Sequence, residues 1–389
     1  MDLAFDHDNI SISNNREKYL RIAIVNFTGG GLSGGYSKYL QNTLPLIAED
    51  ERVAELEVYM PVGHKDIINS PTITVHSIPA SNMHNNKIWL KNELTKRQPD
   101  VIYIPSAMWI NCAQTSIVTM IQNMEPLVVP FHGNPLKESI KNVGRYIANL
   151  QACRKANRVI ALSKFVKTYL TEKWRIASDR IGLVYHGIDL INQTSANDHS
   201  AIASLEARPF LFTAGSIRPA RGLEDIINAL SILNTDQPMQ LIVGGNVDPG
   251  MEPYFCKLKK MANNAGISER VHWTGKLPDS AMAWCFAHCK AFIMTSRTES
   301  FGMIAGEAMA HGCLCISSEN PCLPEIFGPS ALYYPPKDFT ILAKQIQSVL
   351  SMGEVERVTM SNTAKDIASR FSWEVCAKKT VDELQKALR

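Results

Sequence analysis

Two glutamates eight positions apart, Glu299 and Glu307, are the residues of this chain whose type and spacing best suit chemistry. The run 290–295, with Ala, Phe, Ile and Met at its centre, is typical of a buried strand, and 302–311 places apolar residues at helical spacing. A helix is therefore expected to begin near Ser300, where its free amides and positive dipole end would attract an anion. Glu299 in the loop would then reach one part of a ligand, and Glu307 in the second turn would reach another.

A metal site made by these two carboxylates is a poor interpretation of the spacing. Eight helical residues leave the two side chains about 80° apart around the helix axis. The spacing instead favours two hydroxyl-rich groups on either side of a phosphate, one held by each glutamate.

The segment resembles the signature of the retaining glycosyltransferase family 4, whose members have the GT-B fold. The likeness rests on Glu299, Phe301-Gly302 and Glu307, and on the run Ala308-Met-Ala-His-Gly followed by Cys-Leu-Cys-Ile-Ser. It implies that Glu299 holds hydroxyls of a donor sugar and that Glu307 holds the nucleotide ribose. It further implies that the donor diphosphate binds the backbone of Ser300, Phe301, Gly302, Met303 and Ile304.

Length and composition describe an ordinary globular protein with room for two domains. The 389 residues are 45% hydrophobic and 20% charged, and a net charge of +3 is too weak to favour nucleic acid as a partner. A polar start, nine cysteines and the lack of a membrane-length apolar run favour a cytoplasmic protein with reduced thiols. Cys285, His288 and Cys289 have helical spacing, but no second cluster completes a metal site, so burial is the better interpretation.

Apolar runs of strand type recur along the chain with helix-length stretches between them, which predicts an α/β protein with parallel sheets covered on both faces. The predicted strands include 21–27, 57–60, 101–104, 126–131, 158–162 and 181–185, and then 210–214, 240–244, 271–274, 291–294 and 314–317. Ligands bind at the strand carboxyl ends of open α/β sheets, so the active site is expected in a cleft between two facing domains.

The predicted domain order is a polar tail (1–18), a doubly wound Rossmann-like acceptor domain (19–190), a linker (191–207), a doubly wound Rossmann-like domain for the nucleotide-sugar (208–370) and a C-terminal helix (371–389). The linker is assigned because its residues are polar, small and without pattern. In GT-B proteins a terminal helix of this kind crosses back to the first domain.

A glycine-rich loop follows the first expected strand. Gly29 to Gly34 fit the G-x-G-x-x-G fingerprint of dinucleotide-binding proteins, but the second strand ends at 58–64 without the acidic residue that would bind ribose. The loop is therefore either an amide-rich element facing the cleft or a purely structural tight turn. Its resemblance to the Gly-Gly loop of the transferase family implies that Gly34 and Gly35 approach the donor phosphate and the acceptor.

Cationic side chains rather than a metal or another cofactor are expected to balance the donor diphosphate. Asp6 and Asp8 form the D-x-D pattern that GT-A enzymes use for a divalent metal, but they precede any strand that would fix their geometry. Arg218 and Arg221 lie in a loop at an expected helix start, where both could converge on a pyrophosphate. Relative to the family, Ser216 stands where arginine is usual, so either Arg218 substitutes for the missing cation or the loop is weaker. A solvated arginine pair is the alternative.

Three further positions take their roles from the resemblance. His132, just past the expected strand 126–131, stands where the family carries a cleft histidine that contacts the donor sugar or the acceptor; a structural histidine is the alternative. Lys276 and Leu277 stand where family members commonly contact the nucleotide base, although such a loop is as often a mere connection. The segment 320–326 lacks the glycines of the family's Gly-Gly-x-Pro-Glu motif, which predicts a different pocket shape.

Lys137, Lys141 and Arg145 recur every four residues beside an apolar row. The apolar row consists of Leu136, Ile140, Val143 and Ile147. This pattern usually marks the wet side of a packed helix whose apolar face is buried. The alternative is weak peripheral contact with anionic lipid or a phosphorylated lipid acceptor, which high salt would release.

Together these observations predict a metal-independent hexosyltransferase that moves a sugar from a UDP- or GDP-sugar to an acceptor hydroxyl with retention of configuration. Catalytic roles are assigned to Glu299, His132, Arg218 and Arg221. The acceptor is expected to be a glycan or lipid-linked glycan of bacterial surface-polysaccharide or lipopolysaccharide assembly, at the inner face of the membrane. The alternatives are a nucleotide-sugar epimerase of GT-B fold and a non-catalytic sugar-nucleotide-binding protein.

Overall fold

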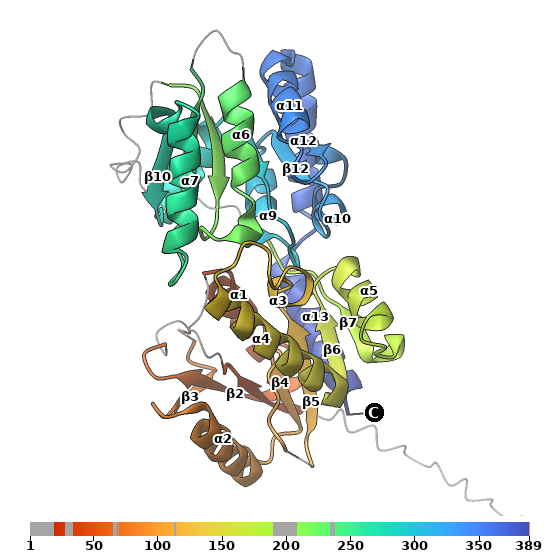
Figure 1. Ribbon diagram of the computed structural model, residues 1–389. Coiled ribbons are helices and arrows are strands. Elements are labelled where there is room, and N and C mark those ends of the chain that lie inside the picture. The colour runs from red at the N-terminus through yellow and green to blue at the C-terminus, as the bar shows by residue number, and fades with distance from the viewer. Residues whose placement is uncertain are drawn as a thin grey trace, which may run out of the picture.

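The computed structural model describes residues 19–27, 34–64, 68, 70–112, 114–189, 208–233 and 238–388. The predictions for the tail, for the linker, for Asp6 and Asp8, and for the glycine loop before Gly34 lie outside these residues. Within them the chain forms two α/β domains, each built on a parallel sheet (Figure 1). The predicted pair of doubly wound domains is thereby confirmed.

The first domain carries a sheet of strand order β3-β2-β1-β4-β5-β6-β7. Its strands are β1 (Leu20–Val25), β2 (Val53–Pro61), β3 (Thr74–Ile78), β4 (Val101–Ile104), β5 (Ser116–Ile121), β6 (Arg158–Ala161) and β7 (Ile181–Leu183). Its helices are α1 (Gly34–Ala48), α2 (Met83–Arg97), α3 (Glu125–Val128), α4 (Leu136–Lys155) and α5 (Lys164–Glu172). The apolar runs are buried along their length, as in β4, because helices cover both faces of a parallel sheet.

The second domain carries a sheet of strand order β10-β9-β8-β11-β12-β13. Its strands are β8 (Phe210–Ala214), β9 (Gln240–Gly244), β10 (Val271–Gly275), β11 (Ala291–Met294), β12 (Cys315–Ser318) and β13 (Ala331–Tyr334). The helices that follow are α6 (Glu224–Ile232), α7 (Glu252–Asn264), α8 (Asp279–His288), α9 (Met303–Ala310), α10 (Leu323–Phe327), α11 (Phe339–Ser351), α12 (Glu354–Ala368) and α13 (Trp373–Lys386).

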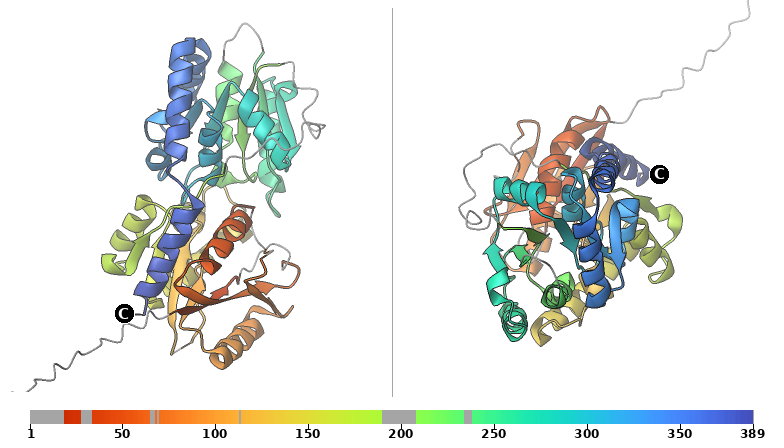
Figure 2. Two further views of the ribbon diagram at one scale, coloured as in Figure 1. Left: turned by 180° about the vertical axis from the view of Figure 1, so that it is seen from behind. Right: turned by 90° about the horizontal axis from the view of Figure 1, so that it is seen from above.

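The last helix, α13, leaves the second domain and lies on the first (Figure 2). It packs along α1 and β6, with Arg52 Nη1 2.6 Å from Asp382 Oδ1 and Arg158 Nη2 2.5 Å from Glu383 Oε2. Where the chain passes between the domains, the Ile188 amide donates to the Phe371 carbonyl at 2.9 Å. The two segments of the chain that pass between the domains, near residues 188 and 371, are therefore joined by a hydrogen bond.

One predicted strand of the first domain is wrong. The run 126–131 is not a strand: α3 covers Glu125–Val128, and a turn follows it. The strand in this part of the sheet is β5, which ends earlier. Pro126 fits the first turn of a helix, and Pro130 has no amide for a ladder hydrogen bond, so the two prolines oppose strand pairing despite the apolar residues between them.

The structure also bears on membrane insertion. No helix in the described part of the chain combines the length and apolarity needed to cross a bilayer.

Candidate active site

The loop after β11 and the start of α9 form the centre of the candidate site. The helix begins at Met303, and Gly302 before it adopts φ 88°, a left-handed conformation that favours glycine. The amides of Met303 and Ile304, the first two residues of α9, have no carbonyl partner within the helix, so this end can receive an anion. The predicted helix start near Ser300 to Gly302 agrees with this boundary.

Glu299, in the loop, forms an ion pair with Arg221 of the same domain. Arg221 Nη1 also donates to Ser296 Oγ at 3.2 Å. The arginine crosses Gly215, which has φ 127° and where an added Cβ would come within 2.9 Å of Arg221 Nε. This glycine is therefore required by both its backbone conformation and the closeness of the guanidinium.

A buried ion pair underlies this part of the site. Arg297 Nη1 and Nη2 donate to Asp225 at 2.5 and 2.7 Å, and both side chains are buried. Asp225 also accepts from the Tyr334 hydroxyl at 3.0 Å and from the Lys337 amide at 3.1 Å. Breaking a buried pair of this kind costs about 3–5 kcal/mol, so the loop that carries Glu299 is firmly fixed. Sequence reasoning missed Asp225, because nothing in its own segment points to Arg297.

Glu307, in α9, is buried and forms an ion pair with Lys38 of α1 in the other domain. Burial raises the pKa of Glu307 above its usual value, although the Lys38 ammonium opposes the shift. The pKa of Lys38 is raised as well, because the attraction of Glu307, Asp279 and Asp189 outweighs the lowering by burial. Lys38 was not a predicted site residue, since it lies 269 positions from Glu307.

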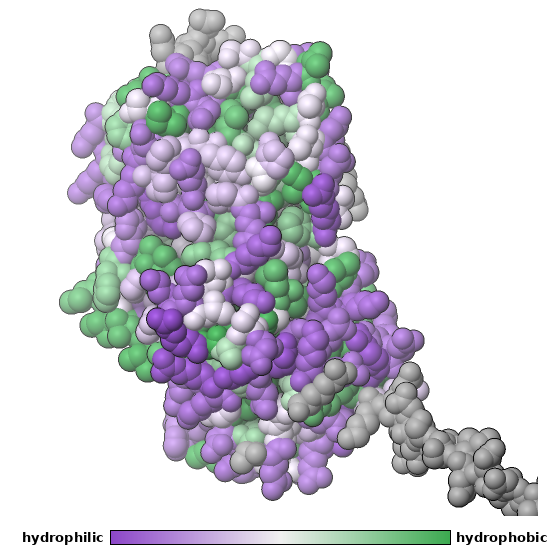
Figure 3. Space-filling model, turned by 90° about the vertical axis from the view of Figure 1, so that its right-hand side faces the viewer, coloured by the Kyte–Doolittle hydropathy of each residue, from purple (hydrophilic) through white to green (hydrophobic). Residues whose placement is uncertain are grey.

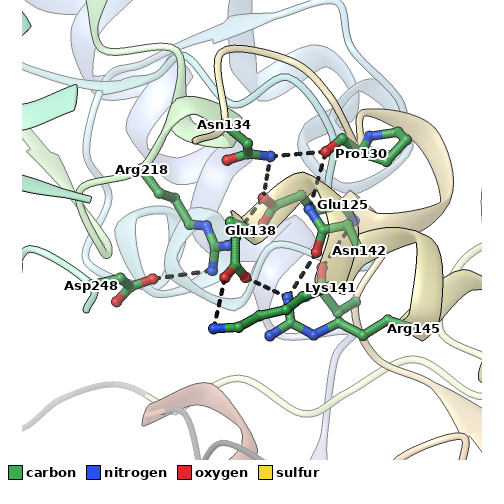
Figure 4. A network of polar contacts seen from close by, with 10 residues as sticks. Glu125, Pro130, Asn134, Glu138, Lys141, Asn142, Arg145, Arg218 and Asp248 are labelled. Carbon is green, nitrogen blue, oxygen red and sulfur yellow. Dashed lines mark hydrogen bonds and ion pairs between the residues drawn. The ribbon is translucent and has the colours of Figure 1, made fainter. Parts of the chain in front are cut away.

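Arg218 lies between the domains, in a polar network with Glu125 and Asp248 (Figure 4). Its Nη2 is 2.9 Å from Glu125 Oε2 of the first domain, and its Nη1 is 3.1 Å from Asp248 Oδ2 of the second. Glu125 also accepts from Asn134 Nδ2 at 3.1 Å. Two carboxylates thus balance the Arg218 guanidinium. Ser216, at the position where the family usually has an arginine, is half-buried and adds no positive charge. The assignment of Arg218 to the diphosphate stays a prediction.

Three other predicted contacts lie around the same cleft. An added Cβ on Gly35 would come 2.5 Å from Met303 Cε, so the start of α1 faces the start of α9, whereas one on Gly34 would meet nothing within 4 Å. His132 is half-buried near the second domain, and burial, then Lys337 and Arg297, lower its pKa although Glu224 and Asp225 pull the other way.

The base-contact residues differ from each other in exposure. Leu277 is buried in the core, and an added Cβ on Gly244 would come 3.1 Å from its Cδ1. Lys276 is exposed, with its amide 2.9 Å from Asn246 Oδ1. Of the two, Lys276 has the side chain that a nucleotide could reach.

Further contacts hold the two domains against each other. Glu325 accepts from the Lys164 amide at 2.7 Å and from the Tyr185 hydroxyl at 2.6 Å, and so caps α5 from the other domain. Ser300 Oγ donates to the Gln122 carbonyl at 2.6 Å. In the altered segment after β12, Asn320 Nδ2 donates to the Ser296 carbonyl at 2.9 Å, so this segment supports the loop that carries Glu299.

Metal ligands do not gather in the part of the chain that the structure describes. No group of three or more His, Cys, Asp or Glu side chains there could hold a metal ion.

The fold is that of known GT-B proteins. Sucrose-phosphate synthase from Thermosynechococcus elongatus superposes with a TM-score of 0.75 at 19% identity, covering 94% of this chain and 98% of that one. HepE from Anabaena, in complex with UDP-glucose, superposes with a TM-score of 0.73 at 18% identity, covering 94% of this chain and 100% of that one. These likenesses place the chain in the GT-B fold class.

The sequence specifies the family. The glycosyl transferases group 1 model matches residues 179–366, and the glycosyltransferase family 4 model matches residues 49–191. The chain thus belongs to the glycosyltransferases of family 4 type. An uncharacterized glycosyltransferase of Methanocaldococcus jannaschii is 23% identical over 367 residues, 90% of this chain and 95% of that protein.

Other curated relatives match over part of their length. A second uncharacterized glycosyltransferase of Methanocaldococcus jannaschii is 23% identical over 252 residues, 62% of each chain. The serotype-specific mannosyltransferase WbdA of Escherichia coli is 24% identical over 254 residues, 63% of this chain but only 30% of that protein. The aligned region thus covers less than two thirds of both relatives.

Proposed function

We propose that this protein transfers a hexose from a UDP- or GDP-sugar to an acceptor hydroxyl with retention of anomeric configuration. One observation carries the proposal: Glu299 and Glu307 lie on either side of the free N-terminus of α9, and each is held by a cation. A donor supplies matching groups, because its sugar and ribose hydroxyls suit the carboxylates and its diphosphate suits the helix end.

Each end of the donor has its own partner in this proposal. The ribose hydroxyls replace Lys38 as the partner of Glu307, and the sugar hydroxyls bind Glu299. Arg221 and the amides of 301–304 stabilise the diphosphate as the bond between the anomeric carbon and the phosphate oxygen breaks. The acceptor oxygen attacks that carbon from the same face, and its proton passes to the departing phosphate.

His132 and Arg218 complete the proposed chemistry from the opposite side of the cleft. The lowered pKa keeps the His132 imidazole neutral near pH 7, so it can accept a hydrogen bond from a sugar or acceptor hydroxyl. Arg218 reaches the diphosphate if donor binding releases it from Glu125. Full activity in the presence of a chelator is expected, and strict dependence on a divalent metal would contradict the proposal.

The relatives support the choice of donor by analogy. HepE has been crystallised with UDP-glucose, and WbdA is named a mannosyltransferase. We place the acceptor among glycans or lipid-linked glycans of bacterial surface-polysaccharide assembly, and the protein in the cytoplasm at the inner face of the membrane.

A panel of nucleotide-sugars tests the proposal. The purified protein is incubated with UDP- and GDP-hexoses without acceptor, and nucleotide release and sugar identity are followed. Slow hydrolysis of one donor supports transfer, an isomerised sugar identifies an epimerase, and binding without turnover identifies a non-catalytic protein. Glu307→Ala should weaken binding of the preferred nucleotide, and Glu319→Ala, on an exposed side chain, is the matched control.

A further inference from the structure

The helix α4 lies on the first domain with its apolar side turned to solvent. Four residues form a row along it, hereafter the α4 stripe: Leu136, Ile140, Val143 and Ile147. Their exposed fractions are 77%, 64%, 40% and 60%, although the sequence pattern predicted a buried apolar face. That expectation is wrong here.

The buried side of α4 is polar near its start, whereas farther along Cys153, Tyr146 and Leu150 pack in an apolar cluster of the domain. Ser139 and Asn142 are buried, and Asn142 Nδ2 donates to the Pro130 carbonyl at 3.3 Å. Ser139 Oγ donates to the Asn134 carbonyl at 3.4 Å. Hydrogen bonds to the turn after α3 and these apolar contacts therefore fix which way α4 faces, and an apolar stripe is left uncovered.

The exposed apolar surface extends beyond the helix. Phe131, just before α4, is 66% exposed, and Val128 is 39% exposed. Figure 3 shows hydrophobic side chains at the left-hand edge of the molecule, next to strongly hydrophilic ones. Contiguous apolar patches on a soluble protein mark surfaces that contact a partner or a membrane.

Basic side chains lie beside the stripe. Lys137, Lys141 and Arg145 are exposed. At about 100° per residue, Lys137 lies about 60° around the helix axis from Ile140 at the edge of the stripe, and Lys141 and Arg145 are turned progressively farther from it. Glu138 pairs with Lys141 at 3.3 Å and with Arg145 at 2.5 Å, but it is the one acidic residue of α4 against five basic ones. The surface around the stripe is thus cationic.

We propose that the α4 stripe docks on the surface of an anionic lipid bilayer. The apolar side chains would enter the boundary between headgroups and acyl chains, and Lys137 at the edge of the stripe would reach the lipid phosphates, while Lys141 and Arg145 add to the positive charge of the helix. A second copy of the chain fits this surface poorly, because pairing two stripes would bring the like-charged rows of both copies together.

Docking in this way would bring the bilayer close to the cleft. The turn that precedes α4 contacts the second domain, where an added Cβ on Gly133 would lie 3.3 Å from Pro219 Cβ. Glu125, at the start of α3 just before this turn, forms an ion pair with Arg218 of the second domain. An acceptor held in the membrane would therefore reach the site near the first domain. Docking itself does not depend on the proposed transfer reaction.

Vesicle flotation with the full chain tests the proposal. Vesicles of phosphatidylcholine alone are compared with vesicles that also contain phosphatidylglycerol, at low and high salt. We expect flotation with the anionic vesicles, weakened by salt. The double variant Ile140→Ser and Ile147→Ser should bind at least about tenfold more weakly. Val355→Ser with Val358→Ser, at exposed positions of α12, is the matched control and should bind as the wild type does.

A second variant separates charge from apolar contact. Lys137→Gln with Lys141→Gln should weaken binding to anionic vesicles and reduce its dependence on salt. Thermal unfolding of all variants should match the wild type, since the changed side chains are exposed. Three results would overturn the proposal: no flotation of the wild type, equal flotation of the double isoleucine variant, or a wild-type dimer that this variant converts to monomers.

Discussion

Glu299 and Glu307 lie at two ends of one segment, but their cations come from different places. Arg221, the partner of Glu299, belongs to the same domain, whereas Lys38, the partner of Glu307, belongs to the other domain. Opening of the cleft would leave the first pair intact and would separate the second. The two ends of the site therefore differ: one is built within a single domain, and the other is made by residues of both domains.

The largest expected effect is at Glu299. Glu299→Gln removes the charge that holds Arg221 and the acceptor of sugar hydroxyls, so transfer should fall roughly 10²–10³-fold. Nucleotide binding should change little, because Glu307 and the helix amides are untouched. Steady-state transfer rates and UDP or GDP titration measure the two effects, with Glu319→Gln as control. A large loss of nucleotide affinity in Glu299→Gln would erase the distinction between the two ends.

The segment between the two glutamates gives a pH test. Phe301 lies against His186, with ring centroids 5.6 Å apart, and Tyr39 and Trp373 also surround this imidazole. His186 is buried, its Nδ1 has no hydrogen-bond partner, and burial lowers its pKa to about 3. In the unfolded chain the His186 imidazole has an ordinary pKa of about 6.5 and takes up a proton below that pH, whereas in the folded chain it stays neutral. The folded state therefore loses stability as pH falls from about 6.5 toward 3.

His186→Phe should therefore flatten the acid limb of the stability curve. The slope from one such histidine is roughly 1.4 kcal/mol per pH unit, so at pH 4.5 the wild type should have lost about 2–3 kcal/mol more than the variant, each relative to pH 7.5. Urea unfolding at both pH values measures the difference. Parallel acid slopes for the two proteins would mean that water reaches the imidazole where the domains meet.

The smallest expected effect is at Lys38. Lys38→Met leaves Glu307 buried without its cation, which should destabilise the protein by about 1–2 kcal/mol at pH 8. Burial already raises the pKa of Glu307, and loss of the Lys38 ammonium raises it further. The carboxyl is then protonated as pH falls, so the loss of stability should shrink toward pH 5. Thermal unfolding of Lys38→Met and of the double variant with Glu307→Gln measures this. Recovery is expected in the double variant, and equal losses at both pH values would refute the pairing.

Local sequence patterns predicted the helices and strands better than they predicted which side chains pair across the fold. The alternation of apolar runs predicted two parallel sheets but missed the strands β3, β5 and β13. Phe301-Gly302 within its apolar surroundings predicted the start of α9, because glycine and periodicity are local signals. Lys38 and Asp225 were missed because their partners lie far away in the chain. The false strand at 126–131 shows two prolines outweighing apolar content.

The orientation of α4 was not predictable from amphipathicity. A pattern of apolar and basic residues shows that a helix has two sides, but not which side meets the domain. Here the buried side combines Ser139 and Asn142, whose polar atoms find carbonyl partners in the turn after α3, with the apolar contacts of Tyr146, Leu150 and Cys153.

The path of α13 means that the first domain does not correspond to an unbroken stretch of the chain, whereas the second domain does. Trp373, Cys376 and Leu384 are buried in a helix that is translated last and yet covers α1, which is translated among the first. The first domain can therefore complete its hydrophobic core only after the C-terminal residues have been synthesised. A chain truncated before residue 371 would expose the apolar surface that α13 covers and would tend to aggregate. A separate peptide of residues 371–388 would be expected to bind that surface.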